Sequence, residues 1–223
     1  MIWSHADRLR FDRIIETLEK NFSIEMGSSY TPFEVLISTI LSQNTNRDNT
    51  TKAFERLKEQ FKITPQELAS ADLEEIKRCI KPAGLYNAKA RRIRKVARII
   101  WEQYDGDLSK ILNLPTSEAR NMLLSLPGVG RKTADVVLSF CTNKGTFPVD
   151  THINRIAKRL RWVEEKAGYE EIRHFFEDMV SEKQRKKVHL VLIEFGRKVC
   201  RAKNPHCKTC PIREDCQNEN ICQ

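Results

Sequence analysis

The residues best placed to do chemistry lie in two short stretches and in a cysteine-rich tail. The first stretch is LPGVGRKTADVVL, from Leu126 to Leu138. Its proline and glycines should end one helix, and the apolar spacing after them predicts that another begins at once. In this helix-hairpin-helix, Gly128 and Gly130 would let the backbone approach a partner closely, and the N–H groups of the new helix would bind phosphate. The alternative is a turn between packed helices.

Lys132 falls in the first turn of that second helix. The positive end of the helix dipole and the neighbouring Arg131 both favour the uncharged amine there. An uncharged amine is a nucleophile that can form a Schiff base with an aldehyde or with the anomeric carbon of a sugar. On charge alone, a lysine that only binds phosphate explains the position equally well.

The second stretch, VDTHINRIAKRL, places Asp150 directly before an amphipathic helix. Aspartate is a preferred N-cap residue, a role that implies no chemistry and contributes about 1 kcal/mol. A carboxylate can also serve as a general base or stabilise positive charge in a transition state. Spacing alone leaves both roles open.

The tail carries four of the seven cysteines within seventeen residues, at the spacing C-x6-C-x2-C-x5-C. Four thiolates at this spacing predict a metal site, and both zinc and a 4Fe–4S cluster accept four thiolates. The predicted ligands are Cys200, Cys207, Cys210 and Cys216. Two further cysteines, Cys79 and Cys141, lie alone in apolar patterns and are interpreted as buried thiols, and Cys222 is left over near the end of the chain.

Helical periodicity recurs along almost the whole chain, and no segment alternates as a strand would, so the pattern predicts an all-α fold of roughly ten helices. Thr31-Pro32-Phe33-Glu34 reads as an N-cap, a proline at the first helical position and a capping box. Thr116, after Pro115, should begin another helix in a similar way.

The 223 residues are 40% hydrophobic, enough for a buried core, and their net charge of +9 favours a polyanionic partner. Neither a secretory signal nor an apolar segment long enough to span a membrane occurs. We therefore expect a soluble, cytoplasmic protein without a membrane partner.

Together these stretches carry a resemblance. LPGVGRKTADVVL followed by VDTHINRIAKRL resembles the helix-hairpin-helix, Gly-Pro-Asp signature of the endonuclease III family of DNA glycosylases. The segments TPFEVLISTILSQNT and IKPAGLYNAKARRI and the cysteine tail also have counterparts there, in the same order.

The resemblance implies a fold of two lobes with a cleft between them. A helical barrel over 25–144 would carry the hairpin, while 1–24 and 145–223 would form a second helical domain around the cluster. Lys132 and Asp150 would face each other across the cleft.

It also implies a bifunctional base-excision-repair enzyme, working at the prokaryotic nucleoid as a monomer, that removes oxidised or reduced pyrimidines from duplex DNA and cleaves abasic sites. Lys132 would attack C1′ of the damaged nucleotide, and Asp150 would deprotonate Lys132 or stabilise charge on the sugar. The family uses the same cysteine spacing for a 4Fe–4S cluster, which decides against zinc.

The resemblance further implies the residues that hold the DNA open after the base leaves the stack. Leu85 would be an apolar wedge, and either Gln43 or Asn44 would fill the vacated space. Arg201 and Lys203, between the first two cysteines, would meet the DNA backbone. The alternatives are a packed leucine behind a capping glycine and, for the two cations, ordinary solvated charges.

Two positions depart from the familiar bacterial pattern, because Leu124 replaces a glutamate and Asp135 an asparagine. Two other functions stay open from the sequence: a mismatch glycosylase acting on G:T or G:U, and a non-catalytic DNA-binding module.

Overall fold

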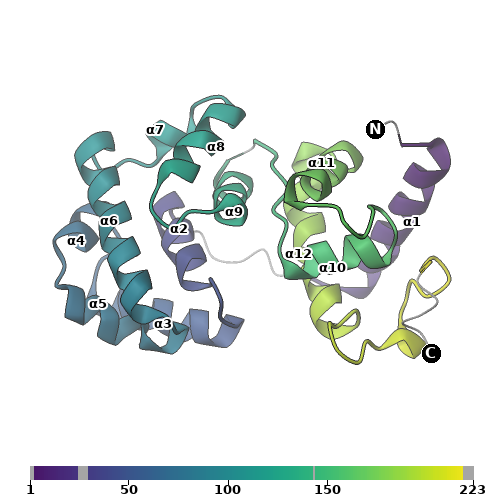
Figure 1. Cartoon of the computed structure of the whole chain (residues 1–223), viewed down its shortest axis with the longest axis horizontal. Coiled ribbons are helices and arrows are strands. Elements are labelled where there is room, and N and C mark those ends of the chain that lie inside the picture. The colour runs from purple at the N-terminus through teal and green to yellow at the C-terminus, as the bar shows by residue number, and fades with distance from the viewer. Residues whose placement is uncertain (1–2, 25–29, 143, 218–223) are drawn as a thin grey trace. The chain divides into compact units, whose positions relative to one another are not determined.

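The computed structural model describes residues 3–24, 30–142 and 144–217. Every regular element in these ranges is a helix, as Figure 1 shows, which confirms the all-α prediction. The chain divides into two compact units, Ser28–Thr142 and Met1–Gly27 with Asn143–Gln223. The boundary expected at residue 25 falls outside the described residues, as does Cys222.

The unit of residues 28–142 is built around one long helix, α6 (Tyr86–Tyr104), which packs against α4 (Pro65–Ser70) and α5 (Leu73–Ile80). Another pair is formed by α2 (Pro32–Leu41) and α9 (Arg131–Cys141). The other helices of this unit are α3 (Arg47–Gln60), η1 (Lys81–Ala83), α7 (Ser109–Leu112) and α8 (Thr116–Ser125). Apolar residues three and four apart on α6, among them Ile93, Val96 and Ile100, are completely buried in the shared core.

Local sequence determines where two of these helices begin. At α2, the Thr31 hydroxyl accepts from the Glu34 N–H at 3.2 Å and the Glu34 carboxylate accepts from the Thr31 N–H at 2.8 Å, which confirms the capping box. A helix does begin at Thr116, as expected, but the N-cap role expected for its side chain is wrong. Thr116 is the first helical residue of α8, and the flanking residue is Pro115, whose ring has no oxygen with which to cap the helix.

The second unit contains α1 (His5–Asn21), α10 (Thr151–Arg159), α11 (Tyr169–Met179), α12 (Glu182–Lys198) and η2 (Cys207–Thr209). Its core is aromatic: Phe147 stacks on Phe176 with ring centroids 4.3 Å apart, and Phe11 packs on Trp162 at 4.9 Å. The helix α12 packs against both α1 and α10. No helix in the described ranges is long and apolar enough to cross a membrane.

A buried ion pair joins the two helices of the hairpin. Asp135 on α9 is completely buried, and Arg120 on α8 donates to its two oxygens from Nε at 2.8 Å and from Nη2 at 3.1 Å. This two-pronged geometry fixes the position of both side chains. Asp135, one of the two departures from the family pattern, therefore ties α8 to α9.

Replacing Arg120 by alanine should lower the free energy of unfolding by about 3–5 kcal/mol, because it removes both of these donors from a buried carboxylate. The measurement is urea unfolding followed by circular dichroism. The control is Arg98→Ala, which breaks an exposed ion pair with Glu102 on α6 and should cost about 1 kcal/mol or less. Equal losses for the two variants would show that the buried pair does not stabilise the hairpin.

Candidate functional site

The hairpin has the tight geometry that its sequence predicts. The helix α8 ends at Ser125, Gly128 adopts a left-handed conformation with φ +77°, and Gly130 is the N-cap of α9. Leu126 and Val129 are buried and hold the turn to the core, whereas Gly128 and Gly130 are both exposed. Gly130 has no side chain with which to cap the first turn of α9.

Gly128 is also held by close contact with α6. A Cβ atom at this position would lie 2.5 Å from Cδ of Arg92, so only glycine fits without a shift. Gln43, just beyond the end of α2, donates from Nε2 to the Gly128 carbonyl at 2.9 Å and accepts from Arg92 Nη1 at 3.3 Å. The structure thus brings Gln43 and the hairpin together and adds Arg92, which sequence reasoning did not identify.

The two candidate catalytic residues both lie at helix starts. Lys132 is the second residue of α9 and is half-buried. Asp150 is the N-cap of α10, and its Oδ1 accepts from the N–H groups of His152 at 2.8 Å and Ile153 at 2.9 Å. The capping role is therefore confirmed, and it leaves Oδ2 for another partner. Lys132 belongs to the unit of residues 28–142 and Asp150 to the other unit.

Leu85 and Asn44 share an unusual backbone conformation on the unit of residues 28–142. Leu85 has φ +48° and its side chain is 59% exposed, so the alternative of a packed leucine is wrong. Asn44 has φ +53° and is also exposed. Left-handed backbone is costly for residues other than glycine and is found where the surroundings impose it, often at functional sites.

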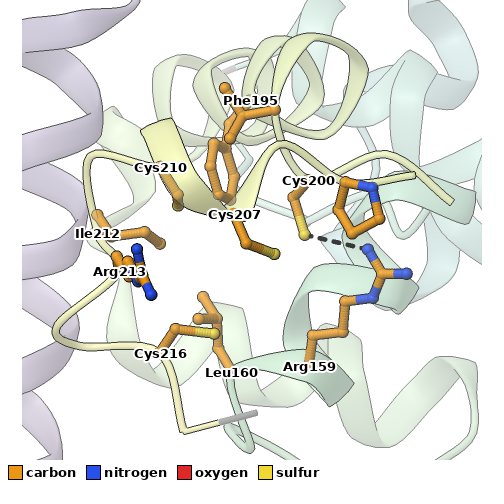
Figure 2. A pocket seen from close by; sticks show the side chains of 11 residues that line it. Arg159, Leu160, Phe195, Cys200, Cys207, Cys210, Ile212, Arg213 and Cys216 are labelled. Atoms are coloured by element: carbon orange, nitrogen blue, oxygen red, sulfur yellow. Dashed lines mark hydrogen bonds between the residues drawn. The ribbon is translucent and has the colours of Figure 1, made fainter. Parts of the chain in front are cut away.

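The four tail cysteines line one pocket in the second unit. Figure 2 shows the side chains of Cys200, Cys207, Cys210 and Cys216 around a shared space, backed by Leu160, Phe195 and Ile212. Across residues 3–24, 30–142 and 144–217, no three acidic, histidine or cysteine side chains converge closely enough to bind a single metal ion.

Two arginines of α10 hold the loop that begins at the first cysteine. Arg155 Nε donates to the Cys200 carbonyl at 3.0 Å, and Arg159 donates to the carbonyls of Arg201 at 2.6 Å and Ala202 at 3.2 Å. Figure 2 also shows Arg159 bonded to the Cys200 sulfur, at 3.4 Å. Sequence reasoning missed both, because arginines on the polar face of an amphipathic helix look like solvated charges.

The loop that these arginines hold presents Arg201 and Lys203 on the surface, where both residues are exposed.

At the other end of α10, burial lowers the pKa of His152, and the nearby Asp150 only partly opposes that shift. The neutral imidazole that burial favours can accept the bond of 3.0 Å between Arg155 Nη2 and His152 Nδ1. The helix that Asp150 caps is therefore tied to the cysteine loop.

The chain matches known proteins over most of its length. The model of the HhH-GPD superfamily base excision DNA repair proteins matches residues 37–182, more than half of the chain. Endonuclease III of Thermotoga maritima is 41% identical over 186 residues, 83% of each chain. Endonuclease III of Sulfolobus acidocaldarius is 36% identical over 211 residues, 94% of this chain and 92% of its own.

A solved structure shows the same fold. The structure of a trapped endonuclease III–DNA covalent intermediate matches 98% of this chain and 97% of its own, with a TM-score of 0.83 and 30% sequence identity. The hairpin, the capping aspartate and the cysteine pocket thus lie in a chain that belongs to the endonuclease III family, within the HhH-GPD superfamily of base excision DNA repair proteins.

Proposed function

We propose that this protein removes oxidised or reduced pyrimidines from duplex DNA and cleaves the resulting abasic site, with Lys132 as nucleophile. Family membership supports the activity class, a DNA glycosylase with AP lyase activity. The observation that carries the residue assignment is the position of Lys132, half-buried in the first turn of an uncapped helix directly after the hairpin. A monofunctional glycosylase needs only an activated water, whereas strand cleavage through a Schiff base needs an amine.

In the proposed reaction the uncharged amine of Lys132 attacks C1′ of the damaged nucleotide. Nζ forms a bond to C1′ while the bond between C1′ and the base nitrogen breaks, and the base leaves with that electron pair. The C1′–O4′ bond of the sugar ring then breaks, O4′ takes up a proton as a hydroxyl group, and an imine joins Nζ to C1′. Removal of a proton from C2′ then expels the 3′ phosphate by β-elimination. Asp150 takes the proton from Lys132 or stabilises positive charge on the sugar, through the oxygen that does not cap α10.

Three parts of the unit of residues 28–142 would handle the duplex. The glycines Gly128 and Gly130 would bring the N–H groups of α9 to a phosphate, a contact that positions the enzyme without reading sequence. Residues 84–85, the wedge loop, would insert Leu85 into the base stack. Residues 42–44, the gap-filling loop, would occupy the vacated space, and Asn44 is the better candidate because Gln43 is bonded to the hairpin.

The donor set of the cysteine pocket is four thiolates, which suits a 4Fe–4S cluster as well as zinc. The spacing is the one that the resemblance to the endonuclease III family links to a 4Fe–4S cluster, and membership of that family supports the cluster. A cluster bound by Cys200, Cys207, Cys210 and Cys216 would staple the tail, and the loop with Arg201 and Lys203 would then meet DNA phosphates.

Borohydride should trap the protein covalently on duplex DNA that contains one thymine glycol, because it reduces the imine to a stable amine. Lys132→Ala should abolish this adduct while DNA affinity changes by about threefold or less, since one phosphate contact at most is lost. Gel electrophoresis measures the adduct and fluorescence anisotropy the affinity. Trapping that persists in the variant would refute the assignment, and a wild-type protein that traps on neither thymine glycol nor an abasic site would refute the proposed function.

Asp150→Asn separates the capping role from the catalytic one. Asparagine caps helices as well as aspartate does, so the free energy of unfolding should change by about 0.5 kcal/mol or less. Loss of the carboxylate should slow excision in single-turnover assays by about 10²-fold or more. The control is Asp72→Asn at the N-cap of α5, where the carboxylate accepts a hydrogen bond from the backbone N–H of Glu75 at 3.0 Å. Excision by this control variant should not change. Unchanged excision in Asp150→Asn would leave Asp150 with the capping role alone.

Protein purified without oxygen should contain equal amounts of iron and acid-labile sulfide, with broad visible absorption and no zinc. Cys210→Ser should lower both contents together and lower the melting temperature, because a thiolate ligand is lost. Cys79→Ser, a cysteine on α5 in the other unit, should keep the full iron content. Stoichiometric zinc in place of iron would overturn the assignment of the cluster.

A further inference from the structure

Lys89 is a buried lysine to which the proposed reaction assigns no role. It lies on α6 with 1% of its surface exposed. Its Nζ donates to the carbonyl of Leu41 at 2.8 Å and to the carbonyl of Ala83 at 2.8 Å. A single ammonium group therefore bridges two segments of chain that lie far apart in sequence.

The two carbonyls stand at corresponding positions. Leu41 is the last residue of α2, and Ala83 is the last residue of η1. Carbonyls at the C-terminal end of a helix lack partners within the helix, and they carry the negative end of its dipole. A buried cation between two such ends therefore satisfies backbone acceptors that an apolar side chain would leave without a donor.

Keeping an amine charged in this place is costly. Burial lowers the pKa of Lys89, and the neighbouring Arg92 lowers it further. A methionine of similar length would fill the same volume without that cost. The charge is thus better explained by the position of the two carbonyls than by packing.

Both carbonyls lie immediately before a loop that would contact DNA. The gap-filling loop of residues 42–44 begins after Leu41, and the wedge loop of residues 84–85 begins after Ala83. Each loop contains an exposed residue in the left-handed region, Asn44 with φ +53° and Leu85 with φ +48°. Such conformations persist only where the surroundings impose them. The ammonium of Lys89 anchors the residue from which each loop departs.

We infer that Lys89 is a positioning residue that holds the gap-filling loop and the wedge loop at a fixed separation, so that both enter the duplex as one unit when the damaged base leaves the stack. This inference rests on the proposed function. Lys89 is buried and touches no DNA, so it acts entirely through the two loops. Replacing Lys89 should therefore slow the reaction when a stacked, paired base must be extruded, and much less when the base is already missing.

The test compares two substrates in single-turnover assays: a duplex with one thymine glycol opposite adenine, and the same duplex with an abasic site in its place. Lys89→Met should slow base excision by about 10²-fold, as expected when reacting parts are misplaced by about 1 Å. Cleavage of the abasic duplex should change by about threefold or less, because no base has to be unstacked. Rates are divided by the number of sites that borohydride traps on abasic DNA, so that only folded enzyme counts.

Three further arms separate positioning from loss of stability. Ile93→Ala removes a buried side chain one turn further along α6; it should lower the number of sites that borohydride traps, but should leave both rates per trapped site unchanged. Extruding thymine glycol costs less free energy when the opposite base is missing, so on that duplex the excision rate of Lys89→Met should approach the wild-type rate. In a Leu85→Ala background, adding Lys89→Met should have a smaller effect than in the wild type, because the wedge of one of the two loops through which Lys89 acts is already gone.

Should Lys89→Met fold too poorly to assay, Lys89→Gln provides the same comparison, since an amide can donate to one carbonyl and should give an intermediate loss. Equal losses on both substrates, no loss on either, or a full effect in the Leu85→Ala background would each overturn the inference. Wild-type protein inactive on both substrates would instead overturn the proposed function.

Discussion

This structure depends on supplying a hydrogen-bond donor to the carbonyl groups at the ends of its helices. A chain of helices joined by short loops leaves such acceptors wherever a helix stops, and a buried acceptor without a donor is costly. Here long basic side chains from neighbouring helices supply the donors. Lys89 bonds to Leu41 and Ala83, and Arg155 bonds to Gly196 and Cys200. The loops next to these ends are held in place by the same bonds.

This arrangement suits an enzyme that must open a duplex. Unstacking a base costs a few kcal/mol, and loops that were ordered only on binding would add the entropy of ordering to that cost. Loops that begin at anchored carbonyl groups are already ordered, so they lose less conformational entropy on binding. The two hydrogen bonds from Arg120 to Asp135 likewise order the hairpin before binding, because they fix α9, and with it Lys132, relative to α8. Preorganisation is therefore built into the backbone of the unit of residues 28–142.

The elements are easier to predict from the sequence than their contacts. The capping box at Thr31, the hairpin turn and the cap at Asp150 follow from local chemistry, and each occurs as expected. The cap expected at Thr116 is wrong, because a proline occupies the flanking position before it. The pairing of Lys89 with two carbonyls could not be predicted, since backbone acceptors have no sequence signature. Asp135 stands out in the sequence only as a departure from the family pattern, and its partner Arg120 is evident only in three dimensions.

The internal use of basic side chains changes what the net charge means. The value of +9 counts Lys89, Arg120, Arg155 and Arg159, although all four are already bonded within the protein. A cation releases a condensed counterion from DNA only if it reaches a phosphate. The dependence of DNA affinity on salt will therefore follow the number of basic groups at the DNA-facing surface, which is smaller than the basic composition suggests. Lys89, Arg155 and Arg159 instead bond to carbonyl groups of the protein's own backbone.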